Sequence, residues 1–271
     1  MATIQALNIY PVKSCRGIAV DAATVTPMGF DRDREWLIVD ASHRFITQRE
    51  EPRLALVVPS LTHEALELAV PGRDPLRLGL DDEGESVEVV IWKDRCAAFD
   101  LGSAASAWLS DHLDRHVRLV RFDRRRKRVS SPDWTGDIEA LTRFADAFPW
   151  LVISQASLED LNSRLPEPLP MNRFRPNIVI ADVPPYAEDR AHELHVGNVV
   201  LRIVKPCTRC AIPTTDQETA ARKSDQPLRA LKAYRFEKKL KGVLFGQNAI
   251  LIAGSGETLQ VGQEMQVSWK S

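Results

Sequence analysis

The sequence of 271 residues has no apolar run near the roughly 20 residues that a membrane-spanning helix needs. Its first residues, Met-Ala-Thr-Ile-Gln, lack the basic region and the apolar core of a secretory signal. Only four cysteines are present, which is too few for a disulfide framework in a chain of this length. These absences predict a cytoplasmic protein that acts neither in nor on a membrane.

An excess of charge of one sign is also missing. Lysine and arginine number 36 against 37 aspartates and glutamates, so the net charge is −1. Such a chain has no overall attraction to nucleic acid. The six histidines show no His-x-x-x-His spacing, and Cys15 and Cys96 are isolated, which gives a structural zinc site little support.

Short apolar runs separated by turn residues dominate the chain. This spacing favours a barrel or a sandwich. We expect strands over residues 4–10, 18–26, 31–39, 65–70, 76–80, 87–92, 117–122, 177–181, 194–196, 199–204, 249–253 and 259–269. Helices are expected over 103–112, from Ser157 with Asp160 in a weak capping box, and over about 227–236 with Asp225 as cap.

The composition changes at the basic run, residues 124–128, Arg-Arg-Arg-Lys-Arg. Loop residues follow at 131–137, so we place a domain boundary or a long functional loop here. The boundary divides the chain into residues 1–120 and 121–271. The basic run could dock an acidic partner, because charge steers such encounters. A solvated loop explains it equally well.

The most informative stretch is residues 205–216, Lys-Pro-Cys-Thr-Arg-Cys-Ala-Ile-Pro-Thr-Thr-Asp. It follows the expected strand 199–204, and Pro206 and Pro213 oppose a helix, so we interpret it as a loop. Neighbouring cations favour the thiolate, the form that attacks electrophiles and binds metals. A Cys-x-x-Cys pair alone is compatible with zinc, with redox chemistry or with simple packing, and packing is the commonest of these.

Several cations and hydroxyls lie where a polar turn meets an apolar run. They are Lys13 with Ser14, Arg34, and Arg175 in Asn-Arg-Phe-Arg-Pro-Asn at 172–177. If they converged on one pocket, they would bind a phosphate or another oxyanion. The sequence alone does not establish that they converge.

Longer motifs resemble a known family. Residues 9–17, 31–36 and 48–54 resemble the N-terminal β-barrel module that accompanies MOSC domains. Residues 174–179, the Cys-Thr-Arg-Cys loop with Thr214-Thr215-Asp216, and residues 244–248 resemble the MOSC domain itself. The relatives recognised are the mitochondrial amidoxime-reducing components and their bacterial counterparts. The resemblance implies a mainly β (α+β) fold of two β-barrel-like modules, the N-terminal barrel in 1–120 and the MOSC barrel in 121–271.

The family binds a pterin-held molybdenum through one cysteine, and the matching catalytic and metal-ligating residue is Cys210. One soft thiolate beside the two pterin sulfurs suffices, which accounts for a Cys-x-x-Cys without a second pair. Cys207 matches a cysteine that is not a ligand, and we expect it to be buried. The residues that match positions holding the pterin and its phosphate are Lys13, Ser14, Arg34, Ser154, Arg175, Asn177, Thr208 and Arg209.

The chain departs from the eukaryotic pattern just before Pro149. Those relatives carry a small hydroxyl pair there, and this chain has Ala147-Phe148. Any side-chain contact to the cofactor at that point is therefore lost or made by backbone.

The resemblance implies a molybdenum-dependent, amidoxime reductase-like enzyme that takes the oxygen atom from N-hydroxylated compounds at the metal. No cysteine follows Cys210, so we expect no iron–sulfur cluster in this chain. Electrons would come from a separate ferredoxin- or flavoprotein-type donor. The other expected partner is a small N-hydroxylated substrate, with no nucleic acid and no membrane, and we expect a monomer. Asp216 is a candidate proton donor, but the role is left unassigned.

Two alternatives remain at this point. The loop could carry a persulfide on Cys210 or Cys207, or hold the cofactor without turnover, as a sulfur or cofactor carrier. Sulfurase relatives add a pyridoxal-phosphate domain, for which this chain is too short. The weaker alternative is a β scaffold with a structural zinc.

Overall fold

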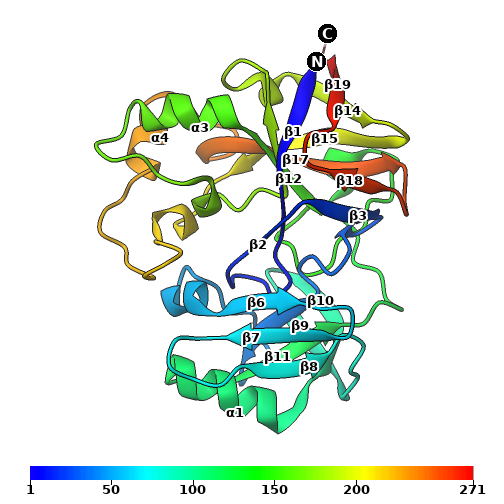
Figure 1. Ribbon diagram of the computed structural model, residues 1–271, viewed down its shortest axis with the longest axis vertical. Coiled ribbons are helices and arrows are strands. Elements are labelled where there is room, and N and C mark those ends of the chain that lie inside the picture. The colour runs from blue at the N-terminus through cyan, green and yellow to red at the C-terminus, as the bar shows by residue number, and fades with distance from the viewer. Residues whose placement is uncertain (271) are drawn as a thin grey trace.

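A closed barrel of seven strands forms the upper body of the computed structural model, which describes residues 1–270 (Figure 1). A pairing of its first strand with its last closes it. Its strands, in spatial order, are β12 (Trp150–Ser154), β13 (Ile178–Ala181), β1 (Ala2–Ile9), β19 (Glu264–Trp269), β14 (Ala191–Val196), β15 (Val199–Thr208) and β17 (Gly242–Ala253).

The lower body packs two sheets and a helix around an apolar core, and a second apolar cluster of this body includes Leu37, Val89 and Phe122. The core includes Trp36, Ile38, Leu66, Leu68 and Leu109. The sheets are β5 (Trp36–Asp40), β11 (Val117–Phe122), β10 (Asp94–Asp100) and β9 (Glu85–Ile91), and β6 (Val58–Leu61), β7 (Ala65–Ala69) and β8 (Leu76–Gly79); the helix is α1 (Gly102–Leu113). The predicted mainly β fold with two barrel-like modules is confirmed.

Smaller elements complete the fold. Short strands pair at the barrel's margins, α3 and α4 lie between consecutive barrel strands in the chain, and α2 lies in the connection from β11 to β12. These elements are β2 (Ile18–Val20), β3 (Ala22–Thr26), β4 (Gly29–Phe30), β16 (Phe236–Glu237), β18 (Thr258–Gln260), α2 (Pro132–Thr135), α3 (Gln155–Asn162) and α4 (Leu228–Tyr234). Within residues 1–270 no helix is both long and apolar enough to cross a bilayer.

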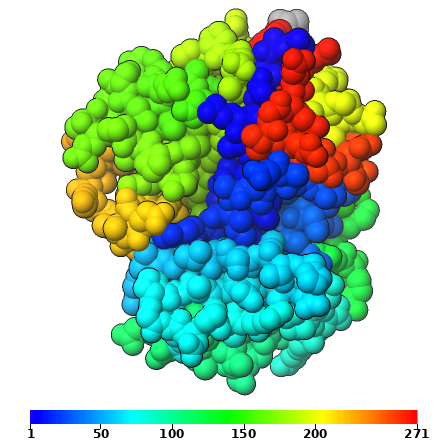
Figure 2. Space-filling view, in the orientation of Figure 1, coloured from blue at the N-terminus to red at the C-terminus, as the bar shows by residue number. Residues whose placement is uncertain are grey.

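The first strand belongs to the upper body although the following residues build the lower one. β1 pairs with β13 on one side and with β19 on the other. The chain then descends, and in Figure 2 the blue N-terminal residues fill the space between the two bodies. Residues just after β1 and just before β5 therefore lie at the junction, where Val12 and Trp36 bridge in parallel. This path places both Lys13 and Arg34 at the junction of the two bodies.

Several predicted elements have different limits in the structure. Residues 31–34 form a turn, and the strand begins only at Trp36. The C-terminal region contains β18 and β19 where one strand was expected, and β17 begins at Gly242, not at Ala249. The helix at 103–112 is confirmed. The third helix is shorter than predicted and the Asp225 side chain does not cap it.

The strand that carries the first cysteine of the pair is longer than predicted. β15 continues through Pro206 and Cys207 to Thr208, so the expectation of a loop from residue 205 was wrong. A proline is tolerated in a sheet at an irregularity in the pairing. The register against β17 shifts between Ile203 and Lys205, and again between Pro206 and Thr208. Only Cys210 lies beyond the end of the strand.

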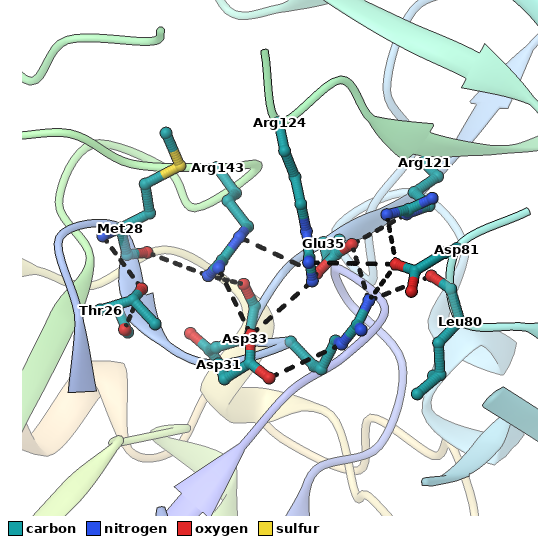
Figure 3. Close-up of polar contacts among 12 residues, drawn as sticks. Thr26, Met28, Asp31, Asp33, Glu35, Leu80, Asp81, Arg121, Arg124 and Arg143 are labelled. Atoms are coloured by element: carbon teal, nitrogen blue, oxygen red, sulfur yellow. Dashed lines mark hydrogen bonds and ion pairs between the residues drawn. The ribbon is translucent and has the colours of Figure 1, made fainter. Parts of the chain in front are cut away.

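The basic run 124–128 is largely neutralised by the chain itself. Arg124 reaches the fully buried carboxylate of Glu35 at 2.5 Å, as Figure 3 shows. Arg128 is buried, pairs with Asp94 at 2.9 Å and donates to three backbone carbonyls. Arg125 pairs with Asp123, and Lys127 with Glu139. This run therefore tethers a loop and offers little free charge to a partner.

Candidate functional site

A cavity at the junction of the two bodies gathers most of the residues that the sequence analysis selected. It is open to solvent, and the space available to the centre of a water molecule within it is about 130 Å³. Strand β15, the residues after β1, the turn before β5 and the turn before β13 all contribute to its wall. The predicted site residues that line it are Lys13, Ser14, Arg34, Arg175, Asn177, Thr208, Arg209 and Cys210.

Two arginines of this wall are held by one tyrosine. The guanidinium carbons of Arg34 and Arg175 lie 4.2 and 4.3 Å from the ring centre of Tyr10, within cation–π range. The Tyr10 backbone N–H donates to Asp33 at 2.7 Å, and its hydroxyl donates to the carbonyl of Pro176 at 3.0 Å. Burial raises the pKa of Tyr10 to about 12, so the ring stays neutral. Tyr10 thus brings two like charges together without neutralising either.

Hydrogen bonds fix the direction of both arginines. Arg34 donates to Asn177 at 2.9 Å and to Asp33 at 2.5 Å. Arg175 donates to the carbonyl of Cys15 at 2.6 Å. Burial lowers the pKa of Arg175 to about 10, which still leaves it charged at neutral pH. The two cations are therefore rigid and remain available on the cavity side.

Three lining residues adopt backbone conformations that side chains disfavour. Ser14, Arg34 and Arg175 have φ values of 67°, 46° and 59°. Left-handed φ costs non-glycine residues energy and persists only where surrounding structure enforces it. Such strain concentrated around one cavity is typical of a preorganised binding site.

Asp146 is a cavity residue that the sequence analysis missed. Its carboxylate accepts from Lys13 at 2.6 Å, from Arg49 at 3.1 Å and from the Trp92 indole at 3.3 Å. Desolvation opposes its ionisation, but Lys13 and Arg49 outweigh that and hold the pKa of Asp146 below its usual range. Burial lowers the pKa of Lys13 to about 8. No sequence signal joins Lys13 to a carboxylate 133 residues away.

The two thiols of the Cys-x-x-Cys pair differ in their surroundings. Cys207 is half-buried against an apolar cluster, and its sulfur accepts from Arg209 at 3.0 Å. Within residues 1–270 no hydrogen bond engages the sulfur of Cys210, which is also half-buried and lines the cavity. The geometry leaves Cys210 free for a metal and commits Cys207 to holding Arg209.

Ser154 is the predicted site residue that the cavity does not include. It is fully buried, and its hydroxyl accepts from the backbone N–H of Ser157 at 3.0 Å. It is thereby the N-cap of α3, so the predicted helix start at Ser157 lies too late in the sequence. Serine commonly serves as an N-cap, with its hydroxyl accepting a hydrogen bond from the backbone N–H three residues later.

We expect Ser154→Ala to lower the free energy of unfolding by about 1 kcal/mol, because the helix loses its cap. Urea unfolding measures the change, and the exposed Ser163→Ala is the matched control. The metal content of the protein should be unchanged in both variants. Metal loss in Ser154→Ala at unchanged stability would instead assign the hydroxyl to the cofactor.

Asp216 is already engaged away from the cavity. Its carboxylate pairs with Arg173 at 2.7 Å and accepts from the N–H groups of Glu218 and Thr219. Despite desolvation, these bonds and the Arg173 charge lower the pKa of Asp216. An ionised, fully bonded carboxylate is a poor proton donor, so the geometry does not support that role.

The donor set of the cavity fits an anionic cofactor with a soft metal. Five of the lining side chains are lysine or arginine, only one is acidic, and two are cysteines. The Arg209 Nε is buried without a protein partner. Guanidinium and ammonium groups bind phosphate, and a thiolate suits molybdenum. Within residues 1–270 no group of three or more His, Cys, Asp or Glu side chains could hold a metal by itself.

Known proteins resemble this chain over most of its length. Family models match residues 1–116 as a MOSC N-terminal beta barrel domain and residues 141–266 as a MOSC domain. The human mitochondrial amidoxime-reducing component 1 is 36% identical over 93% of this chain and 79% of its own length. The mouse protein of that name is 35% identical over 91% of this chain and 75% of its own.

A second kind of relative is similar to this chain over nearly its whole length. The rice molybdenum cofactor sulfurase is 32% identical over 98% of this chain, which spans 35% of that larger protein. The two domain matches and the two groups of relatives all indicate one family. The chain belongs to the MOSC family, in the group related to amidoxime-reducing components and molybdenum cofactor sulfurases.

Proposed function

We propose that this protein binds the molybdenum cofactor in the junction cavity and reduces N-hydroxylated compounds with it. The observation that carries the proposal is the convergence of five cations and the free Cys210 thiol on one cavity. The names of the relatives at 35 and 36% identity support the reaction type.

The residues have distinct roles in this proposal. Cys210 would be the one protein ligand of the metal, beyond the end of β15. Arg34, Arg175 and Lys13 would bind the anionic pterin phosphate, with Ser14, Asn177, Thr208 and Arg209 beside them. The bound cofactor would supply two-electron chemistry that removes oxygen from nitrogen.

Lys13 holds its proton on Nζ below a pKa of about 8. It is therefore a cation at neutral pH and can attract the phosphate, while Asp146 fixes its position. Arg175, whose pKa burial lowers only to about 10, keeps its charge over a wider pH range, so anion binding does not rest on Lys13 alone. Electrons would come from a separate donor protein.

The test is to produce the protein in a host with intact pterin synthesis and then supply substrate. We expect about one molybdenum per chain, as a single thiolate site implies. With a reduced viologen dye as electron source, benzamidoxime should become benzamidine. The N–O bond breaks, two electrons and two protons are consumed, and the oxygen leaves as water.

Other results would change the assignment. Zinc in place of molybdenum would contradict the proposal. Molybdenum without turnover of any N-hydroxylated compound would favour a cofactor carrier, which the sulfurase relative makes a reasonable second candidate. A mass gain of one sulfur that reductant removes would place a persulfide on Cys207 or Cys210, the two cysteines in the cavity.

A further inference from the structure

Positive charge is concentrated in residues 222–241, which we name the basic segment. It contains eight lysines and arginines and two acidic residues, although the whole chain has a net charge of −1. The rest of the molecule is therefore acidic overall. The cations of the basic segment are Arg222, Lys223, Arg229, Lys232, Arg235, Lys238, Lys239 and Lys241.

Most of this charge faces solvent. Seven of the eight cations are exposed, and Arg235 is half-buried. Within residues 1–270 the ion pairs of the basic segment involve only Arg229, with Asp225, and Arg235, with Asp189. The aromatic ring of Phe236 is 48% exposed among these cations. An exposed aromatic residue in a segment of unpaired cations is typical of a contact surface, where aromatic residues supply much of the binding energy.

The basic segment lies beside the strand that leads to Cys210. Its short strand β16 pairs with β17, and β17 pairs with β15 at Thr208 and Leu244. The Arg209 N–H donates to Val243 at 2.8 Å, and the Leu244 N–H to Arg235 at 2.9 Å. Neighbouring strands are ~4.8 Å apart, so β16 lies about 10 Å from β15. Figure 1 places α4, which belongs to this segment, on the outside of the upper body.

The basic run 124–128, which the sequence analysis considered for docking, carries little free charge. Carboxylates of Glu35, Asp94, Asp123 and Glu139 occupy four of its five cations.

We propose that the basic segment is the docking surface for an acidic electron-donor protein, with Phe236 as its apolar contact. Complementary charge raises the association rate of such partners by about 10- to 1,000-fold. Only β17 separates β16 from β15, so a donor bound here would lie near the cysteine loop. This inference rests on the proposed function, since it names the surface through which that reaction receives its electrons.

The test compares two matched charge reversals in the holoprotein, Lys238→Glu with Lys239→Glu, and Arg126→Glu with Lys127→Glu. The electron donor is an acidic plant-type [2Fe–2S] ferredoxin at low ionic strength. The 238/239 variant should raise the KM for ferredoxin about tenfold, and raising the salt should shrink the difference, because salt screens exposed charges. The 126/127 variant should stay within about twofold of the unchanged protein. Phe236→Ala should weaken ferredoxin binding even at high salt.

Rates with a reduced viologen dye should be the same in all these variants, since the dye needs no docking surface. Equal ferredoxin KM values in the two charge-reversal variants would overturn the proposal. So would a 238/239 variant that keeps ferredoxin binding but loses binding to phosphatidylserine vesicles or to duplex DNA.

Titration of oxidised ferredoxin, followed by NMR shifts, separates this inference from the function itself. It reports docking without turnover. Wild-type binding that the 238/239 variant loses would support the surface even if no N-hydroxylated compound reacted. Dye-driven turnover without any ferredoxin docking would leave the function standing and remove the surface.

Discussion

Cys210→Ala is expected to contain almost no molybdenum, below about 0.1 atom per chain, while its fold stays intact. The sulfur of Cys210 is the one thiol in the cavity that no protein group engages within residues 1–270. In the proposed site the thiolate is the one bond from the protein to the metal. Without it the cofactor would be held only through its pterin phosphate, so we expect pterin and metal to be lost together during purification. Elemental analysis measures the metal, and circular dichroism checks the fold.

Cys207→Ala is the matched control for this result. Its thiol lies in the same cavity but accepts a hydrogen bond from Arg209 and packs against apolar residues. We expect it to keep most of its molybdenum and to lose about 1 kcal/mol of stability, from a lost hydrogen bond and a small void. Molybdenum retained in Cys210→Ala and lost in Cys207→Ala would assign the metal to the other sulfur.

The sequence identified many residues that line the cavity, but it did not show that these residues lie close together. Lys13, Arg34 and Arg175 each stand at the end of a strand or in the turn before one, and strand ends gather at the edge of a barrel. Their closeness still depended on the tertiary path, since β1 joins the upper barrel before the chain builds the lower body. Periodicity detects strands but not which module they enter.

Other features left no local signal. Asp146 pairs with Lys13 across 133 residues of sequence. Tyr10 contacts the guanidinium groups of both Arg34 and Arg175, and no local pattern predicts either contact. β15 passes through Pro206 because two register irregularities accommodate it, and propensity alone argued for a loop. Ser154 matched a family position, but its hydroxyl is needed by the helix that begins immediately after it.

Glu35→Gln should produce the largest loss of stability of any single polar substitution considered, about 3–5 kcal/mol. Glu35 is fully buried and accepts from Arg121 at 2.9 Å and from Arg124 at 2.5 Å, with Arg143 at 4.0 Å (Figure 3). Glutamine keeps the volume but removes the charge. Arg121 would keep only the exposed Asp81 at 2.9 Å, and Arg143 only Asp31 at 3.9 Å. Both buried guanidiniums would lose their one buried counter-charge, which costs far more than the pair itself contributes.

Asp81→Asn is the control, because it removes one carboxylate from the same cluster at an exposed position. Asp81 pairs with Arg32 and Arg121 but is 73% exposed, so its loss should cost under about 1 kcal/mol. Thermal unfolding should show a fall of roughly 10 °C for Glu35→Gln and at most a few degrees for Asp81→Asn. Equal, small shifts would mean that water reaches Glu35.

The Glu35 cluster also bears on the cavity, because Arg34 is its neighbour in the chain. The Arg34 carbonyl accepts from the Phe144 N–H at 3.0 Å, and the Glu35 carbonyl accepts from Phe122 at 2.9 Å. These bonds and the buried ion pairs enforce the left-handed φ of 46° that directs Arg34 toward Tyr10 and Asn177. Glu35→Gln should therefore lower molybdenum content as well as stability, whereas Asp81→Asn should lower neither. Unchanged metal content in a destabilised Glu35→Gln protein would show that Arg34 is held by its cavity contacts alone.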